Sequence, residues 1–147
     1  MSMKRNRSIP QATVIPVLVY PDVREAVAWL TSAFGAVERV RVGESHRAQM
    51  SIGTDGAFIV AEVRGEQQPP QAGAVTHVIK VRVDDVYAAF ERARSSGARV
   101  LEPPTEHVYG QCECTVEDLA GHWWQFSQTV RDVAPEEYGC KTIEPWV

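Results

Sequence analysis

The feature that constrains the fold most is an internal repeat, in which a strand, a helix and three further strands are expected twice along 147 residues. Asp22-Val23 matches Asp85-Val86 at the two helix starts, and Asp55-Gly56 matches Ala120-Gly121 at two turns. The identity between the halves is thin, so the repeat rests on the pattern of elements more than on individual residues. Self-similarity of this kind predicts two copies of one βαβββ unit.

The first copy is expected over 12–63. Apolar, β-branched residues predict a strand over 12–20, and Asp22 is the expected cap of the helix that follows. This helix carries an apolar stripe, with Gly35 as its left-handed stop. Alternation predicts strands over 37–42 and 47–52, and the turn at 53–56 leads into a strand over 57–63.

The second copy is expected over 75–128, after a Pro- and Gln-rich linker at 64–74. It begins with a strand over 75–83, and either Asp84 or Asp85 caps the helix that follows. A short strand over 99–101 is expected to end before Pro103-Pro104. A tight hairpin over 114–128 turns at 118–121, and a tail at 129–147 starts with a short helix at Pro135.

Composition excludes several classes of function. The chain is 44% hydrophobic and 23% charged with a net charge of −4 and no large charged block, which argues against nucleic acid as a partner. No long apolar run is present, so neither a signal peptide nor a membrane span is expected. Three cysteines (Cys112, Cys114 and Cys140) without an export signal predict reduced thiols in the cytoplasm.

Five stretches carry a resemblance to a known family: V-I-P-V-L-V-Y-P-D-V-x-E-A, A-F-G-A, V-R-V-D-D-V, R-A-x-x-x-G-A and D-x-x-G-H-x-W-x-F-S-Q-T-V-x-D-V-x-P-E-E. Together they resemble the vicinal oxygen chelate superfamily of glyoxalase I, bleomycin resistance proteins and extradiol dioxygenases, and most closely its uncharacterised PhnB-type glyoxalase-like proteins. The resemblance covers roughly residues 12–138 and implies an α+β fold, in which two βαβββ modules form a cup-shaped mixed sheet. Leu119 departs from the proline usual in such relatives, which a type I turn tolerates.

The resemblance also implies where a metal would sit in the cup, held by one residue from the first and last strand of each module. Those positions fall on Ile15, Val78, Gln125 and Val60, the last uncertain within 59–62. A catalytic divalent metal needs about three or four N, O or S ligands. Glu62 lies on the strand face of Val60, but one carboxylate is not a site, so neither a metal nor another cofactor is expected.

The remaining histidines and cysteines are weak candidates. His77 could be a core or rim residue or a metal ligand. We favour a core or rim residue, because His77 is adjacent to Val78 and its side chain is expected on the opposite face of the strand. His46 and His107 lack partners at metal-like spacing, and His122 is expected to be structural. Cys112-x-Cys114 is interpreted as two small buried residues.

The cup could hold a small organic molecule. The expected ligand-binding residues, read from strand alternation, are Val17, Phe58, Val60, Glu62, Val78, Lys80, Arg82, Trp123, Gln125 and Ser127, with Tyr109 closing one end. Lys80 and Arg82 would favour an anionic or hydrogen-bond-accepting ligand, unless both reach past the sheet edge to solvent.

Two functions remain open. The favoured one is a glyoxalase/bleomycin resistance-like protein that binds a small organic molecule without a catalytic metal. The alternative is a metal-dependent lyase, isomerase or dioxygenase, and a purely structural partner module has no positive signal. Each module leaves an open sheet edge, so a homodimer is expected, with the modules paired within one chain or exchanged between two.

Overall fold

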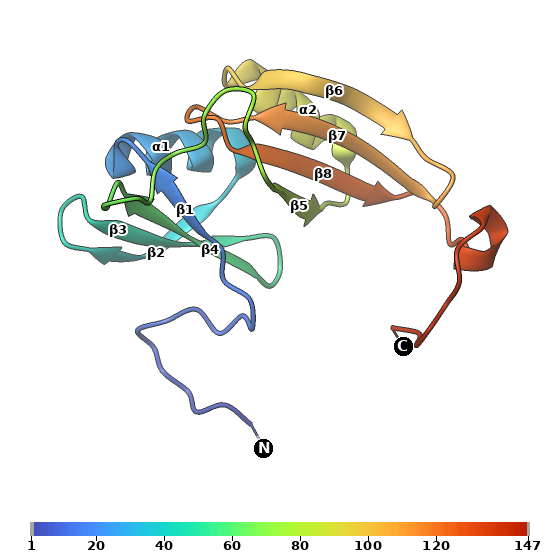
Figure 1. Cartoon of the computed structure of the whole chain (residues 1–147), viewed down its shortest axis with the longest axis horizontal. Coiled ribbons are helices and arrows are strands. Elements are labelled where there is room, and N and C mark those ends of the chain that lie inside the picture. The colour runs from blue at the N-terminus through green and yellow to red at the C-terminus, as the bar shows by residue number, and fades with distance from the viewer. Residues whose placement is uncertain (1, 147) are drawn as a thin grey trace.

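The computed structural model describes residues 2–146 and contains two four-stranded sheets, each with one helix packed against it (Figure 1). The strand order is β1-β4-β3-β2 in the first sheet and β5-β8-β7-β6 in the second. The first strand of each unit runs parallel to the last, and the other pairs are antiparallel. This confirms the predicted α+β fold of two βαβββ units.

The elements have these bounds. The first unit contains β1 (Val17–Tyr20), α1 (Val23–Phe34), β2 (Val37–Val42), β3 (Arg47–Ile52) and β4 (Gly56–Glu62). The second unit contains β5 (Val78–Arg82), α2 (Val86–Ser95), β6 (Arg99–Glu106), β7 (Gln111–Glu117) and β8 (Trp123–Thr129), followed by a short 3₁₀ helix (Pro135–Tyr138). No helix in the described part of the chain has both the length and the apolar character needed to cross a membrane.

The helix ends follow their predicted signals. The Asp22 carboxylate accepts a hydrogen bond from the Glu25 backbone N–H at 3.0 Å, and Gly35 ends α1 with a φ of 72°. The left-handed region is open to glycine at little steric cost. In the second unit the cap is Asp85, whose carboxylate accepts from the Ala88 backbone N–H at 3.1 Å.

Three strand predictions need correction. The expected strands over 12–20 and 75–83 are shorter, since β1 begins at Val17 and β5 at Val78. The expected short strand over 99–101 instead runs as β6 through Pro103-Pro104 to Glu106. Proline is tolerated there because β6 is an edge strand, and the pairing with β7 shifts register between Glu102 and Thr105.

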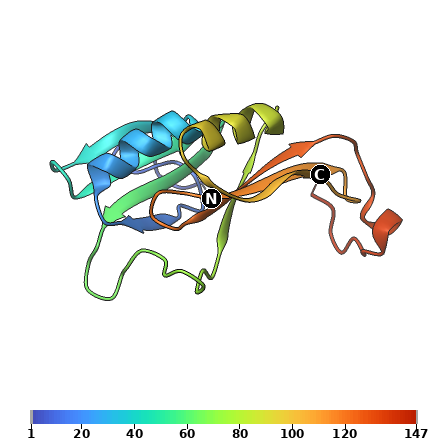
Figure 2. The same ribbon diagram turned by 90° about the horizontal axis from the view of Figure 1, so that it is seen from above.

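An aromatic cluster joins the two units into one core. The Phe34 ring lies 5.0 Å from Trp124 and 5.1 Å from Phe126, and Phe58 lies 5.2 Å from Trp124. The Trp29 indole N–H adds a hydrogen bond to the Ser96 carbonyl at 2.9 Å. Both helices therefore lie on the same side of the two sheets (Figure 2), and the opposite side of each sheet is left without a helix.

The predicted hairpin turn also connects the units. The Asp118 carbonyl accepts from the Gly121 N–H at 3.2 Å. The Asp118 carboxylate accepts from the Tyr20 hydroxyl at 2.6 Å and from the Trp124 indole N–H at 3.0 Å. Buried His122 bonds the Val19 carbonyl through Nε2 at 2.8 Å, which agrees with a structural role.

The tail beyond β8 packs little. Ile143 and Trp146 are 84% and 102% exposed. Trp146 is therefore not packed against the described part of its own chain.

Candidate functional site

The helix-free side of the second sheet gathers most of the sequence-predicted site residues, and we call it the open face. Strand pairing aligns three rows across β5, β8 and β7: Val78, Trp123 and Glu117; Lys80, Gln125 and Thr115; and Arg82, Ser127 and Glu113. The intervening residues, such as Val81 and Trp124, belong to the core under α2. The structure thus brings Val78, Lys80, Arg82, Trp123, Gln125 and Ser127 onto one surface.

The centre of the open face is Glu113, which the sequence interpretation missed. Its side chain is only 1% exposed although no helix covers this side of the sheet. One carboxylate oxygen accepts from the Ser127 hydroxyl at 2.6 Å and pairs with the Lys80 ammonium at 3.1 Å, and the other accepts from the Tyr109 hydroxyl. Burial raises the pKa of Glu113, but these three partners together outweigh it, so its pKa lies below the ordinary value.

Tyr109 lies just before β7 at the end of this face. Its ring stacks on His107 with centroids 5.1 Å apart and planes 1° apart, and the Tyr138 ring lies 6.1 Å away. Burial, then the hydrogen bond to Glu113, raises the pKa of Tyr109 to about 12. The phenol therefore stays protonated at neutral pH, and its O–H group donates a hydrogen bond to the Glu113 carboxylate.

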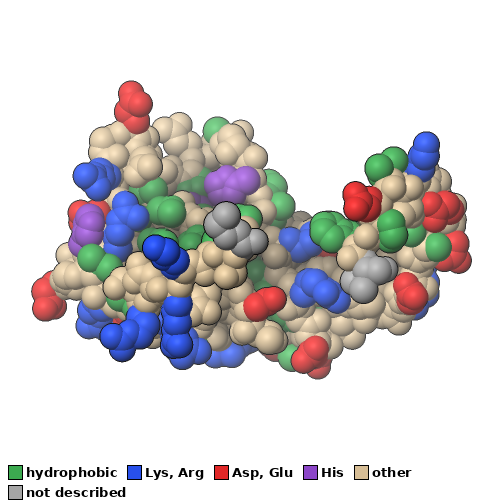
Figure 3. Space-filling view, turned by 90° about the horizontal axis from the view of Figure 1, so that it is seen from below, with side chains coloured by type: hydrophobic (Ala, Val, Ile, Leu, Met, Phe, Trp, Pro, Cys, Tyr) green, Lys and Arg blue, Asp and Glu red, His purple; other side chains and the backbone are tan. Residues whose placement is uncertain are grey.

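A cleft of about 730 Å³ lies beside the open face, between 12–16 and 52–58 of the first unit and 79–84 of the second. Lys80 and Arg82 both line it, and the Lys80 side chain is 53% exposed. Arg82 donates to the Thr129 hydroxyl at 3.3 Å, and no carboxylate within residues 2–146 forms an ion pair with it. Seen from below, basic side chains lie in the hollow between the first unit and the C-terminal segment (Figure 3).

The first unit places two predicted site residues on the other face of their strand. Phe58 and Val60 are 1% and 0% exposed and belong to the core under α1, so neither lies on the open side of the sheet, although Phe58 does line the cleft. Val17, at 45% exposed, lies on that open side beside Ile59. The error was one residue of register, which alternation could not reveal because β4 is apolar on both faces.

The pairing also identifies the correct counterpart of Gln125. Val17 lies six residues before α1 and pairs with Ile59, while Lys80 lies six residues before α2 and pairs with Gln125. Ile59 therefore replaces Val60 as the last-strand position of the first unit. Glu62, at the end of β4, bonds His46 with Oε1 and Nδ1 2.8 Å apart and lies outside the open face.

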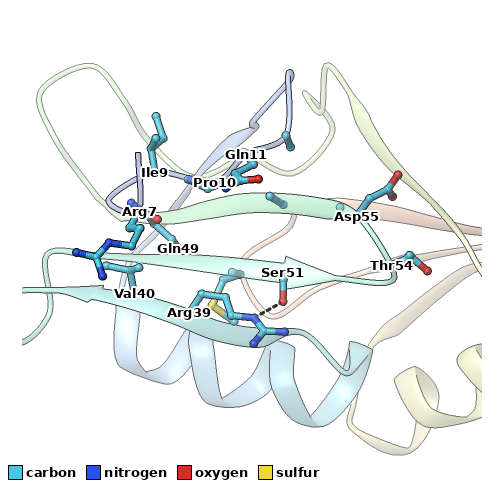
Figure 4. Close-up of a pocket in the computed structure, with 14 residues that line it drawn as sticks. Arg7, Ile9, Pro10, Gln11, Arg39, Val40, Gln49, Ser51, Thr54 and Asp55 are labelled. Atoms are coloured by element: carbon cyan, nitrogen blue, oxygen red, sulfur yellow. Dashed lines mark hydrogen bonds between the residues drawn. The ribbon is translucent and has the colours of Figure 1, made fainter. Parts of the chain in front are cut away.

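The N-terminal arm covers part of the helix-free side of the first sheet (Figure 4). The Gln49 amide on β3 donates to the Ser8 carbonyl at 2.8 Å. A cavity of about 400 Å³ remains between the arm and the sheet, with Arg7 and Ile9 on one side and Arg39 and Gln49 on the other. The first sheet thus offers a smaller space than the cleft beside the second.

The residues at the family's metal positions do not fit a catalytic metal. Ile15, Ile59 and Val78 have no donor atom, and Gln125 offers one amide oxygen. No group of three His, Cys, Asp or Glu side chains able to hold an ion occurs within residues 2–146. His77 is exposed just before β5 and does not join the residues facing α2.

The cysteines offer no alternative centre. Cys112 and Cys114 are free and buried in the core, and Cys140 is free and exposed. Burial raises the pKa of the Cys114 thiol to about 11. A thiol with such a pKa is a poor nucleophile and a poor metal ligand at neutral pH.

Comparisons with known proteins agree with this geometry. The family model described as Glyoxalase/Bleomycin resistance protein/Dioxygenase superfamily matches residues 10–126. An uncharacterized protein of Mycobacterium bovis is 31% identical over 140 residues, which cover 83% of this chain and 86% of that protein.

Two solved structures illustrate the range of similar folds. TioX from Micromonospora sp. ML1 has a TM-score of 0.64 and 26% identity, covering 80% of this chain and 98% of that one. The fosfomycin resistance protein FosX from Listeria monocytogenes, complexed with Mn(II) and sulfate, has a TM-score of 0.61 and 16% identity, covering 82% and 91%. At that identity the second match concerns the fold alone.

Proposed function

Because the chain belongs to the glyoxalase/bleomycin resistance protein/dioxygenase superfamily, we propose that it binds a small organic anion on its open face without a catalytic metal. The observation that carries this proposal is the pair of cations, Lys80 and Arg82, that borders the cleft beside the open face. A cationic surface with one amide suits a carboxylate or phosphate ligand better than it suits a metal ion.

The anionic group belongs at β5. Glu113 neutralises much of the charge of Lys80, whereas Arg82 keeps its own, so this part of the open face carries a net positive charge. Asp55 and Asp84 also border the cleft, so the attraction for an anion is local to Lys80 and Arg82. Trp123 supplies an aromatic surface in the neighbouring row and favours a ligand with a flat, apolar part.

The proposed wall combines the predicted residues on or beside the helix-free sides of the two sheets, of which Ser127 is itself buried against Glu113. It comprises Val17, Val78, Lys80, Arg82, Tyr109, Trp123, Gln125 and Ser127, and it leaves out Phe58, Val60 and Glu62. Within the superfamily we place the chain with the PhnB-type glyoxalase-like proteins. We also retain a cytoplasmic homodimer, which is supported by three free cysteines and by the exposed tail residues.

Binding is tested with phenylacetate and its neutral isostere phenylacetamide, titrated calorimetrically into chelator-treated protein. We expect phenylacetate to bind and the amide to bind at least about tenfold more weakly, since a charge-assisted hydrogen bond contributes about 1.5–3 kcal/mol. Lys80→Met with Arg82→Met should abolish the difference. Equal binding of both compounds would contradict the proposal.

Elemental analysis of protein purified without chelator or affinity-tag metal tests the other half of the proposal. We expect no stoichiometric transition metal. A metal present at one equivalent would instead favour a lyase, isomerase or dioxygenase of the metal-dependent type, and the assignment of Ile15, Ile59, Val78 and Gln125 would be wrong.

A further inference from the structure

The burial of Glu113 is not explained by the packing of the second sheet. A carboxylate taken out of water lowers stability unless donors compensate it, and an apolar side chain at the same position would need no such partners. Three side chains from three places in the chain, Lys80 on β5, Tyr109 before β7 and Ser127 on β8, supply those donors. The network therefore fixes the positions of its donors on a face that is otherwise open.

The network also determines which hydrogen bonds Tyr109 and Lys80 can still make with a ligand. Tyr109 has one proton and gives it to Glu113, so its oxygen is left as a hydrogen-bond acceptor only. Lys80 has three N–H donors, of which Glu113 takes one, so it remains a donor. Because both groups contact the same carboxylate, an acceptor and a cationic donor lie close together.

Building on the proposed anion site, we infer that Glu113 is a positioning residue that makes Lys80 and Tyr109 a recognition pair for hydroxycarboxylates. The ligand carboxylate accepts from Lys80, and the neighbouring ligand hydroxyl donates to the Tyr109 oxygen. A carboxylate without that hydroxyl binds through Lys80 and Arg82 alone.

Mandelate and phenylacetate test this inference, because they differ only in the hydroxyl beside the carboxylate. Titration calorimetry on the full-length protein should show mandelate binding about fivefold more tightly, the effect of one added hydrogen bond. Tyr109→Phe should bring the ratio of the two affinities to one. Tyr138→Phe, which removes a hydroxyl from the ring beside Tyr109, should leave the ratio as it is.

Glu113→Gln separates positioning from folding. The amide no longer holds the ammonium in place and can donate to the Tyr109 oxygen, so the ratio of the two affinities should approach one. A purely structural role would lower the melting temperature of this variant without changing the ratio. An unchanged ratio in either Tyr109→Phe or Glu113→Gln overturns the inference.

The two proposals fail in different ways. If mandelate and phenylacetate bind the wild-type protein equally and Lys80→Met weakens both, the anion site stands and the hydroxycarboxylate inference is overturned. If neither acid binds, both the anion site and the inference are overturned.

Discussion

The helix-free sides of the two sheets differ although the sheets share one topology. In the first unit, Val17 and Ile59 make only the β1–β4 part of that side apolar, Gln49 and Arg39 lie farther along it, and the N-terminal arm covers part of it. In the second unit, Lys80 and Arg82 occupy the matching edge strand, and a buried carboxylate organises the face. The comparison shows that the two units keep the same core pattern, whereas only the second has a buried carboxylate that holds its neighbouring side chains in place.

The cores beneath the two faces contribute together. Trp124 from β8 packs against Phe34 and Phe58 of the first unit, so neither sheet has a core of its own. Substitutions in the shared core should therefore change the stability of the whole protein, whereas substitutions on the open face should mainly change ligand binding.

The largest effect is expected at Trp124. It is fully buried and joins the two units, so Trp124→Ala should lower the free energy of unfolding by about 3–5 kcal/mol. Chemical denaturation measures this, with Trp123→Ala as the matched control one residue away on the open face. Equal destabilisation by both variants would mean that the assignment of the two faces is wrong.

The hairpin turn should come next. Asp118→Ala leaves the Tyr20 hydroxyl and the Trp124 indole N–H buried without an acceptor, for a loss of about 3 kcal/mol. Asp55→Ala, in the turn of the first unit, removes no side-chain hydrogen bond of the described residues and should change stability by less than about 0.5 kcal/mol. Thermal unfolding of both variants compares the two turns. If Asp118→Ala were as stable as the wild type, the hydrogen bonds of this turn would not be what connects the units.

Acid should weaken the first unit through Glu38. Hydrogen bonds from Arg24 and Arg41 lower its pKa to about 2. Because this folded-state pKa lies below the ordinary one, the stabilisation is full above about pH 4.5 and is lost as the pH falls toward 2. Glu38→Gln should therefore destabilise by about 1 kcal/mol at pH 7, allowing for screening of a partly exposed pair.

The difference between wild type and Glu38→Gln should disappear near pH 2 in denaturant titrations. A difference that stays constant from pH 7 to pH 2 would show that the ion pairs of Glu38 are not its source.

The smallest effect is expected from the arm. Deleting the chain up to Ile9 removes one hydrogen bond to Gln49 and little buried surface, so stability should fall by less than about 1 kcal/mol. The affinity for phenylacetate should not change, because residues 2–9 do not line the cleft beside the open face. Loss of binding in this variant would move the site to the cavity between Arg7 and Arg39.

The fold could be predicted from the sequence because the helix caps, Gly35 and the hairpin turn each depend on residues only a few positions apart. The sequence predicted six of the open-face residues for the same reason, since alternation in β5 and β8 is marked by Lys80, Arg82 and Gln125. It failed in β4, where both faces are apolar and only pairing with β1 reveals that Ile59 is the counterpart of Gln125.

Glu113 could not be predicted for another reason. It lies between Cys112 and Cys114 on a strand, where a glutamate normally indicates a solvent-exposed position. Its burial depends on Tyr109, Lys80 and Ser127, which come from separate elements. The two-residue alternation with Gln111 and Thr115 indicates which side of the sheet Glu113 faces. It does not indicate which side chains donate hydrogen bonds to the carboxylate.

The most direct test of the account is a crystal structure of the protein grown with 4-bromophenylacetate and a chelator, in which the anomalous signal of bromine locates the ligand. We predict that the carboxylate lies within hydrogen-bonding distance of Lys80 or Arg82, with the ring toward Trp123 and no metal between ligand and protein. A ligand bound beneath the N-terminal arm, between Arg7 and Arg39, would contradict the claim that the second sheet carries the site.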